Sequence, residues 1–307
     1  MKTPLVTIVM PVYNMGVYVE ESISSILSQT YKNIEFIILN DGSTDNTASL
    51  IGSIRDSRIN FIDSNENKGN YFRRNEGCKI ASGKYICVMD SDDIALPHRI
   101  ETQIQRMESD DSILACGSFF KIVGNSSTCF TTPKSYDFIK LSLLKNNVVV
   151  HPTLMLNKKI LEEVNYYSEE YYYAADYNLI CDIARKGKIV NIPEQLLEYR
   201  RHEKQISSAH HLKQAQYANL VRVKYLKKLG FCLSEDEERY FTRLMTNAKV
   251  SEFEIDGIEM VVSMLKEQNR IYNIFKPVQF NKYIDLLFSK CYLRNHFQVA
   301  RDGKLSF

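Results

Sequence analysis

This chain of 307 residues contains little glycine and proline, has almost no excess of either charge, and lacks long apolar runs. Its 12 glycines and 7 prolines are too few for a fibrous or linker-dominated protein. The 39 basic and 37 acidic residues give a net charge of +2, which predicts no basic surface for nucleic acid. Seven dispersed cysteines without a CxxC pair argue against a disulfide framework and a structural zinc site. No window approaches the roughly 18 apolar residues of a membrane span, and no signal sequence is apparent, so we expect a cytoplasmic protein.

The first hundred residues alternate between patterns typical of strands and of helices. Short apolar runs predict strands, and each is followed by a segment with helical periodicity. This alternation predicts βαβ units, and therefore an α/β fold with a mainly parallel central sheet flanked by helices. The predicted strands are residues 5–10, 34–39, 59–64 and 85–89, and the predicted helices are residues 17–29, 44–55, 71–81 and 97–108.

The rest of the chain divides into two regions with different patterns of predicted secondary structure. A mixed region comes first, with strands expected at 113–123, 148–156, 189–192 and 196–199 and helices at 136–145 and 176–186. The second region is predicted to be helical throughout, over residues 212–229, 235–250, 257–269 and 278–293. We therefore expect a domain at 1–207, with halves at about 1–110 and 111–207, and a helical C-terminal region at 208–307.

Polar clusters follow three of the predicted strands at the point where each strand ends. They are Tyr13-Asn14, Asn40–Asp45 and Asp90–Asp93. In parallel α/β sheets, ligands bind beyond the carboxyl ends of the strands. The three clusters are therefore expected to share one pocket.

The cluster at Asp90–Asp93 carries three carboxylates within four residues, which repel one another unless a cation or hydrogen-bond donors neutralise them. Such hard oxygen ligands suit Mg²⁺ or Mn²⁺. The alternative is a solvated acidic turn that caps the helix beginning near Pro97. Asp41 could accept hydrogen bonds from a base or a ribose, or could serve the turn alone. Lys68, Arg73 and Arg74 suit phosphate oxygens, or form a charged helix face.

Several ordered motifs together resemble the inverting family 2 glycosyltransferases of the GT-A fold. Those of the first hundred residues are Val6–Asn14, Ser25–Tyr31, Leu39–Thr44, Asn67–Asn75 and Gly83–Ile86 leading into Asp90–Asp93. Further motifs are His151–Met155, Ala175–Tyr177 and Tyr199–His202 followed by Ile206–Ser208, the last resembling bacterial lipooligosaccharide and O-antigen sugar transferases. The resemblance covers about two thirds of the chain, and the segment after residue 210 carries no comparable motif.

The resemblance implies a nucleotide-diphospho-sugar donor, with UDP expected, and a Rossmann-like GT-A catalytic domain. Its donor-binding residues would be Pro11, Tyr13 and Asp41 at the base and ribose, Lys68 and Arg74 near the donor, and Asp90 at the ribose or a bound water. Asp92 is the candidate for direct contact with Mn²⁺ or Mg²⁺. His202 either completes the metal site or contacts the diphosphate, unless it is a surface histidine of a basic loop.

Asp176 matches the position of the family's catalytic aspartate, which implies that it removes the proton from the acceptor hydroxyl. Without that resemblance, it reads as the N-cap of a helix. The family often carries Glu-Asp here, whereas this chain has Ala175-Asp176, which leaves the acceptor undetermined. His151 is expected to be a structural histidine near the acceptor side.

The chain has no tryptophan, and so lacks the Gln-x-x-Arg-Trp motif of processive family 2 synthases. A non-processive enzyme is expected, one that adds a single hexose or N-acetylhexosamine to a glycan or lipid-linked acceptor in bacterial surface polysaccharide biosynthesis. The alternative is a non-catalytic nucleotide-sugar-binding or scaffold protein. Basic and apolar residues between 213 and 229 suit a peripheral membrane contact or core packing. The tyrosines at 166–167 and 171–173 suit an acceptor platform or core packing.

Overall fold

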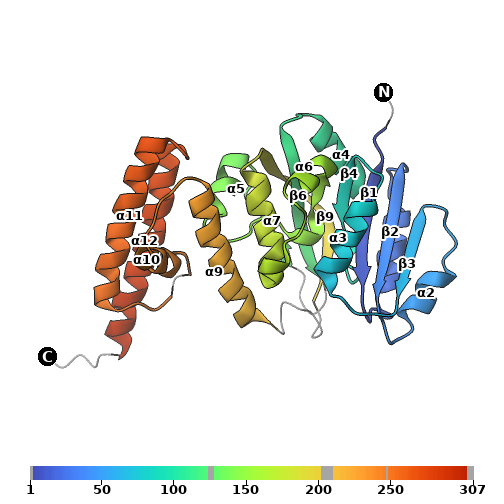
Figure 1. Cartoon of the computed structure of the whole chain (residues 1–307), viewed down its shortest axis with the longest axis horizontal. Helices are drawn as coiled ribbons and strands as arrows, with labels where there is room; N and C mark the ends of the chain where they lie inside the picture. The colour runs from blue at the N-terminus through green and yellow to red at the C-terminus, as the bar shows by residue number, and fades with distance from the viewer. Residues whose placement is uncertain (1–2, 124–127, 202–209, 247, 303–307) are drawn as a thin grey trace. The chain divides into compact units, whose positions relative to one another are not determined.

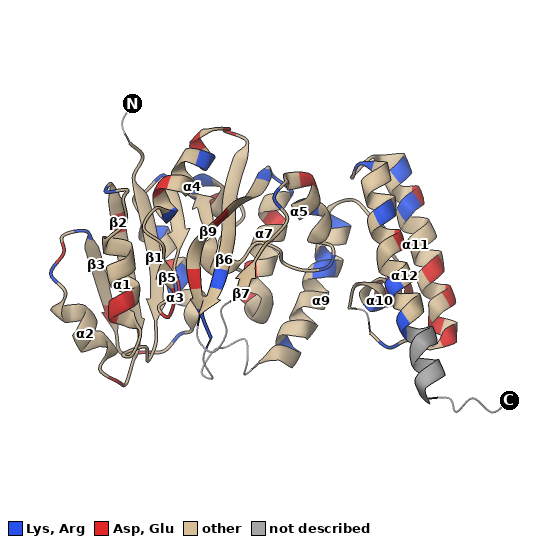
Figure 2. Cartoon of the chain, turned by 180° about the vertical axis from the view of Figure 1, so that it is seen from behind, with Lys and Arg blue, Asp and Glu red and all other residues tan. Residues whose placement is uncertain are grey.

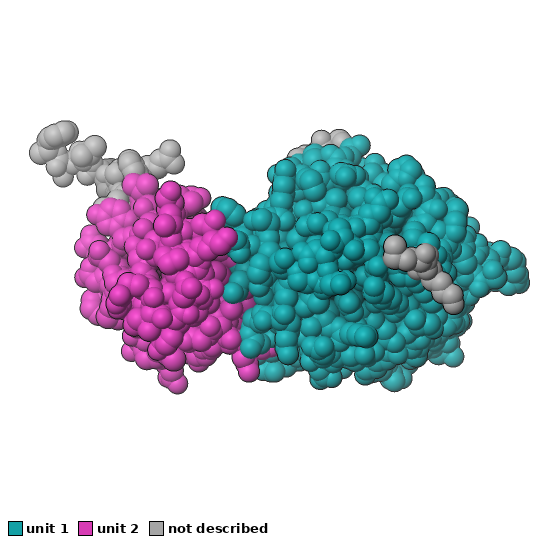
Figure 3. Space-filling view, turned by 90° about the horizontal axis from the view of Figure 1, so that it is seen from above, with its two compact units in different colours: residues 1–140, 147–214 teal, residues 141–146, 215–307 magenta. Residues whose placement is uncertain are grey.

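The computed structural model describes residues 3–123, 128–201, 210–246 and 248–302. They divide into two compact units, drawn in two colours in Figure 3. Unit 1 consists of residues 1–140 and 147–214, and unit 2 of residues 141–146 and 215–307.

Unit 1 is built on a nine-stranded mixed sheet in the order β3-β2-β1-β4-β8-β6-β9-β5, with β7 paired to β6. The four strands β3, β2, β1 and β4 run parallel, as do β6 and β9, while β8, β5 and β7 pair antiparallel. The predicted α/β fold with a mainly parallel sheet is therefore confirmed (Figure 1). The strands are β1 (Val6–Val12), β2 (Ile34–Asp41), β3 (Ile59–Ser64), β4 (Tyr85–Val88), β5 (Ile94–Ala95), β6 (Ile113–Val123), β7 (Thr128–Phe130), β8 (Met155–Asn157) and β9 (Lys188–Arg200).

Helices cover both faces of this sheet, with α3 in front in Figure 1 and α1 in front in the opposite view of Figure 2. One core joins alternate side chains of β1 to apolar residues of α1 and α4. The helices of this unit are α1 (Val19–Leu27), α2 (Thr47–Ser53), α3 (Asn70–Ile80), α4 (Arg99–Glu108), α5 (Tyr136–Ser142, which ends in unit 2), α6 (Lys158–Glu163) and α7 (Ala175–Ala184), with 3₁₀ turns η1 (His151–Thr153) and η2 (Glu169–Ala174).

Three local predictions were wrong. The strand expected at 148–156 is instead the turn η1 followed by β8, and the short helix α6 after it was not predicted. The strands expected at 189–192 and 196–199 form one strand, β9, in which a bulge accommodates Pro193. The helix expected to start at Pro97 begins at Arg99.

The contact of α3 with the sheet depends on a glycine in the middle of the helix. A Cβ atom at Gly77 would lie 2.6 Å from Cγ1 of Val9 and 2.8 Å from Cδ1 of Leu39. Both partners are fully buried strand residues, so neither has space into which to move. The absence of a side chain is what lets α3 approach β1 and β2 this closely.

We expect Gly77→Ala to lower the free energy of unfolding by about 1–3 kcal/mol, because the added methyl overpacks the core. Gly52 in α2 is the matched control, since a Cβ atom there meets nothing within 4 Å. Gly52→Ala is expected to stabilise by up to about 1 kcal/mol through a smaller loss of backbone entropy. Urea unfolding of both variants measures the difference, and equal effects would contradict this account.

Unit 2 contains most of α9 (His211–Lys228) together with α10 (Glu235–Thr246), α11 (Glu252–Tyr272) and α12 (Pro277–Asp302). Its core includes stacked rings of Phe231, Phe275 and Phe280. A capping box formed by Ser251 and Glu254 starts α11. Charged residues of both signs occur along α11, as Figure 2 shows.

Much of the apolar surface that residues 213–229 would need for a membrane contact is buried in the structure. Val221, Tyr225 and Leu226 are almost completely buried there, whereas Leu220 is 56% exposed. The core-packing alternative therefore accounts for most of that apolar face. Within the described residues, no helix is both long and apolar enough to cross a membrane.

Candidate functional site

The loops that follow β1 and β2 are tied together at the carboxyl edge of the sheet. Asn14 adopts a left-handed conformation, with φ of 52°, and its side-chain oxygen accepts a 2.8 Å hydrogen bond from the backbone N–H of Thr44. The backbone N–H of Asn14 donates in turn to Oγ of Ser43, at 2.9 Å. Tyr13 emerges from this junction with 43% of its surface exposed, while Pro11 lies buried within β1. The ring of Tyr13 is therefore available to a ligand at the mouth of the site.

Asp41 at the end of β2 is the centre of a buried polar network. Its carboxylate accepts hydrogen bonds of 2.8 Å from the backbone N–H groups of Lys68 and Gly69, and from Nε of Arg73. Asp41 and Arg73 are each 3% exposed. Three of about four acceptor positions on this carboxylate are thus used within the chain. Asp41 fixes the 66–69 loop against the strand end and retains limited capacity for a base or ribose.

Arg74 points to a different carboxylate, that of Asp90. The guanidinium is 1% exposed and donates to Oδ1 of Asp90 at 2.7 Å and to Oδ1 of Asn70 at 3.2 Å. The side chain of Lys68 is exposed and points to other partners. Its Nζ lies 3.2 Å from the carboxylate of Glu66 and 5.1 Å from the ring centroid of Phe72. The structure therefore joins Arg74, but not the ammonium of Lys68, to the acidic loop.

The acidic loop after β4 brings together carboxylate oxygens of Asp90, Asp92 and Asp93 that lie within 4.8 Å of one another. Asp93 is fully buried, and its Oδ2 has no hydrogen-bond partner within the described part of the chain. Burial raises the pKa of Asp93 well above its usual range, and the carboxylates of Asp92 and Asp90 raise it further. Clustered carboxylate oxygens of this kind are the hard donors that fit Mg²⁺ or Mn²⁺.

Helix α1 holds this loop in place through its polar face. Oγ of Ser22 donates to the backbone oxygens of Ser91 and Asp93, at 2.9 and 2.7 Å. Oγ of Ser25 accepts from the N–H of Ala95 at 3.1 Å. The contact of Ser25 gives a physical role to the first residue of the Ser25–Tyr31 motif.

Asp176 lies in the first turn of α7, where the positive end of the helix dipole favours a carboxylate. Nδ2 of Asn147 donates to its Oδ2 at 3.1 Å. Nothing in the described residues caps α7 through a side chain, so Asp176 is not the N-cap that the sequence offers as an alternative.

The buried imidazole of His151 is influenced by the charges of Asp176, Asp90 and Arg74. Burial, and after it the positive charge of Arg74, lower the pKa of His151 to about 4, although the carboxylates of Asp90 and Asp176 act in the opposite direction. All three charges therefore lie close to one imidazole, in the turn η1 rather than in a strand. Its Nε2 is 2.9 Å from the hydroxyl of Tyr167. The structure thus brings Asp176, Asp90 and Arg74 to the same region of the sheet edge.

The segment that leads to His202 also reaches the acidic loop. The backbone N–H of Arg200, the last residue of β9, donates to Oδ1 of Asp93 at 3.0 Å. Residues 202–209 lie outside the described residues, so the role proposed for His202 stays a prediction.

Residues 7–164 match the family model described as "Glycosyl transferase family 2". The chain belongs to this family. It is 34% identical over 208 residues to the Escherichia coli protein named UDP-Glc:alpha-D-GlcNAc-diphosphoundecaprenol beta-1,3-glucosyltransferase WfgD, covering 66% of this chain and 80% of WfgD. Relatives of this family 2 glycosyltransferase therefore include enzymes named for the synthesis of lipid-linked glycans.

Two solved structures share the fold of the chain. Residues 1–349 of Staphylococcus aureus TarS, in complex with UDP-GlcNAc, superpose with a TM-score of 0.65 at 16% identity, covering 98% of this chain and 93% of that chain. The mannosyltransferase PcManGT from Pyrobaculum calidifontis, in complex with GDP-Man and Mn²⁺, gives 0.61 at 14% identity and covers 97% and 88%. The expected GT-A fold is confirmed.

Sequence reasoning missed several residues that position the site. Asn147 contacts Asp176, and Asn75 forms a pair of hydrogen bonds with the backbone N–H and carbonyl of Tyr167, at 3.0 and 2.8 Å. Both contacts join residues distant in the chain, and no local spacing announces them. Arg73 was visible as a basic residue, but its pairing with Asp41 was not.

Proposed function

We propose that the chain transfers a single hexose or N-acetylhexosamine from a UDP-sugar to a hydroxyl group of a glycan or lipid-linked oligosaccharide, with inversion at the anomeric carbon. The observation that carries the proposal is that the carboxylates of Asp90 and Asp176 both act on the buried imidazole of His151, while carboxylate oxygens of Asp90, Asp92 and Asp93 lie within 4.8 Å of one another. A base and a diphosphate-binding loop must flank one sugar in an in-line displacement. The name of WfgD supports a lipid-linked acceptor and a role in bacterial surface polysaccharide synthesis.

The exposed ring of Tyr13 is proposed to contact the nucleobase, beside the loop that Asp41 holds. Pro11 supports this wall from within β1. Arg74 fixes the Asp90 carboxylate through its 2.7 Å contact, so that Asp90 is oriented toward the ribose. These residues bind and orient the donor and do not take part in bond making.

Asp92 would hold Mn²⁺ or Mg²⁺ directly, with Asp90 near the ion at most through a bound water, Asp93 in the buried part of the loop and His202 as a further proposed ligand. When bound, such an ion supplies positive charge against the negative charge that develops on the leaving diphosphate. Asp176 accepts the proton of the acceptor hydroxyl as that oxygen attacks the anomeric carbon from the face opposite the diphosphate. Asn147 holds the Asp176 carboxylate at the start of α7.

The test is UDP binding by isothermal titration calorimetry, with Mg²⁺ and with EDTA. We expect UDP to bind at least about tenfold more tightly with Mg²⁺, because without a cation the clustered carboxylates of the acidic loop would repel the diphosphate. Asp92→Asn should remove that difference, whereas Asp111→Asn, on an exposed residue, should keep it. Equal affinities under all of these conditions would refute the metal site. A wild-type protein that binds UDP but hydrolyses no UDP-, GDP- or TDP-sugar would support the non-catalytic alternative.

A further inference from the structure

Five aromatic side chains of unit 1 contact one another in series. Tyr167 stacks on Tyr71, with ring centroids 5.3 Å apart. Tyr71 meets Tyr172 edge to face at 5.9 Å, and Tyr172 meets Tyr173 in the same way at 5.2 Å. Tyr173 in turn contacts His210 at 5.4 Å. The row joins α3, the turn η2 and the residue preceding α9.

Two rings of this row are close to residues of the candidate site. Burial raises the pKa of Tyr71 well above its usual range, and the nearby carboxylate of Asp176 raises it further. On the donor side, a Cβ atom built on Gly69 would lie 2.8 Å from the hydroxyl oxygen of Tyr172. Gly69 is the residue whose N–H donates to Asp41. Within the row, Tyr71 therefore lies near the charge of Asp176, and Tyr172 touches the loop that Asp41 holds.

Core packing accounts for Tyr167 completely and for Tyr71 in part. Tyr167 is 2% exposed and is anchored by His151 and Asn75. Tyr71, Tyr172 and Tyr173 each contact a ring on either side, yet all three remain partly exposed to solvent. Perpendicular contacts use the edge of one ring against the face of the next, which leaves other ring surfaces toward solvent.

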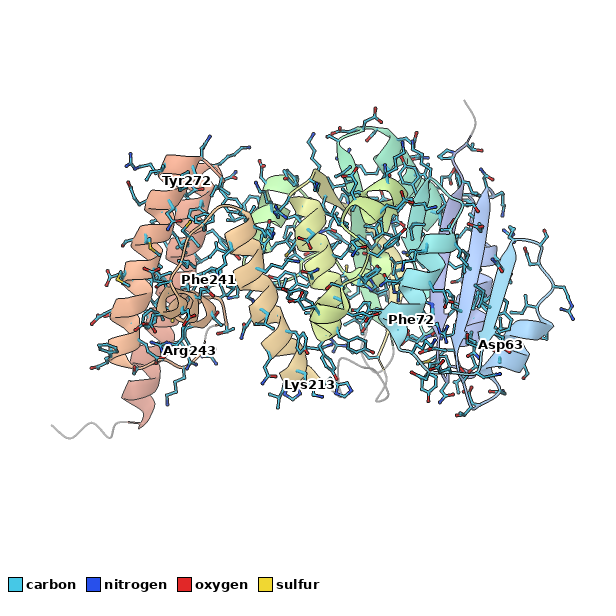
Figure 4. All side chains as sticks on the ribbon, in the orientation of Figure 1. Asp63, Phe72, Lys213, Phe241, Arg243 and Tyr272 are labelled. Atoms are coloured by element: carbon cyan, nitrogen blue, oxygen red, sulfur yellow. The ribbon has the colours of Figure 1, made fainter. Side chains whose placement is uncertain are left out.

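The outer end of the row carries a cation. Nζ of Lys213, at the start of α9 in Figure 4, lies 5.2 Å from the ring centroid of Tyr173 and 3.3 Å from its hydroxyl oxygen. A cation over an aromatic face orients that ring. The orientation of the Tyr173 ring is thus fixed by its contacts with Lys213 and Tyr172 rather than by burial.

We propose that Tyr71, Tyr172 and Tyr173 form the acceptor subsite, in which a pyranose ring of the acceptor glycan packs its C–H face on the tyrosine rings. The inference rests on the proposed function, because it places the acceptor hydroxyl beside Asp176. Rings with an apolar body and a hydroxyl tip suit a sugar, whose C–H groups pack on the ring while its hydroxyls meet the polar tip. The row also compensates for the missing glutamate at Ala175, because it offers a different means of holding the acceptor.

Saturation-transfer-difference NMR tests the subsite directly. The probes are the methyl α- and β-glycosides of glucose, galactose, mannose and N-acetylglucosamine, with UDP and the diamagnetic ion Mg²⁺ present. We expect ring C–H protons of at least one glycoside to be saturated by the wild-type protein. The Tyr172→Ala, Tyr173→Ala double variant should reduce that signal about fivefold or more, while Tyr173→Phe, which keeps the ring, should retain it.

The matched control is Tyr272→Ala, which removes a 60% exposed tyrosine of α11 and should change nothing. Circular dichroism and UDP binding check that the variants are folded, and Tyr173→Leu replaces the double variant if that protein unfolds. The subsite would be overturned if the wild-type protein saturated none of the glycosides. It would also be overturned if the alanine or leucine variant gave the same signal as the wild type. A protein that hydrolyses a UDP-sugar but saturates no glycoside refutes the subsite alone. One that saturates glycosides but hydrolyses no nucleotide sugar refutes the proposed function alone.

Discussion

Asp176→Asn is expected to lower the turnover of a UDP-sugar by about 10²–10⁴-fold, because the amide cannot accept the proton of the attacking hydroxyl. The substitution keeps the size of the side chain, and the amide oxygen can still accept the hydrogen bond from Asn147. The variant loses one favourable charge at the start of α7, which lowers the free energy of unfolding by only about 0.3–1 kcal/mol. The loss should therefore appear in kcat, with UDP affinity unchanged.

The matched control for this variant is Asp182→Asn, which removes a carboxylate from the same helix. Asp182 is 3.6 Å from Arg185 in a partly exposed ion pair, a kind of contact that contributes little to stability. Its turnover should stay within about twofold of wild type, since it removes no group from the site. UDP release from the UDP-sugar, with calorimetric UDP binding alongside, separates the two variants. A turnover of Asp176→Asn close to wild type would exclude Asp176 as the base.

The parallel half of the fold was predictable because its signals are local. Strands β1 and β4 are buried throughout and β2 is buried except at Glu35, and each of the three is followed by or ends in a polar cluster that marks the carboxyl edge of the sheet. The rest of the sheet, from β8 to β5, was less predictable. The register of β9 on β6 shifts from Ser118–Ile192 to Phe119–Gln195, so that Pro193 lies in a bulge. Proline in a strand is tolerated at such irregularities, and a periodicity argument cannot see the partner strand that accommodates it.

The candidate site divides in the same way. Residues at strand ends, such as Tyr13, Asp41 and Asp90, are visible from the chain because topology alone brings them to one edge. The side chains that hold them are not, because Ser22, Asn75 and Asn147 act across long separations in sequence. Sequence reasoning therefore finds the groups that meet a ligand more readily than the groups that position them.

Asp41→Ala is expected to lower the free energy of unfolding of unit 1 by about 3–5 kcal/mol, since it breaks a buried ion pair from one side. The Arg73 guanidinium keeps Glu76 and the carbonyl of Glu66 as partners. Its Nε and the N–H groups of Lys68 and Gly69 lose their acceptor, however, and a buried donor without a partner costs about 1–3 kcal/mol.

The result should be a fall in Tm of roughly 10 °C, as domains of this size lose about 2–4 °C per kcal/mol. Asp63→Ala is the control, because Asp63 is an exposed aspartate near the end of the neighbouring strand β3 (Figure 4) that accepts one hydrogen bond, from Asn40. Its Tm should change by no more than a few degrees. Asp41→Asn should fall between the two, since the amide oxygen can accept from the loop but carries no charge for Arg73. If Asp41→Ala melts like wild type and only loses UDP affinity, then Asp41 serves the ligand and not the loop.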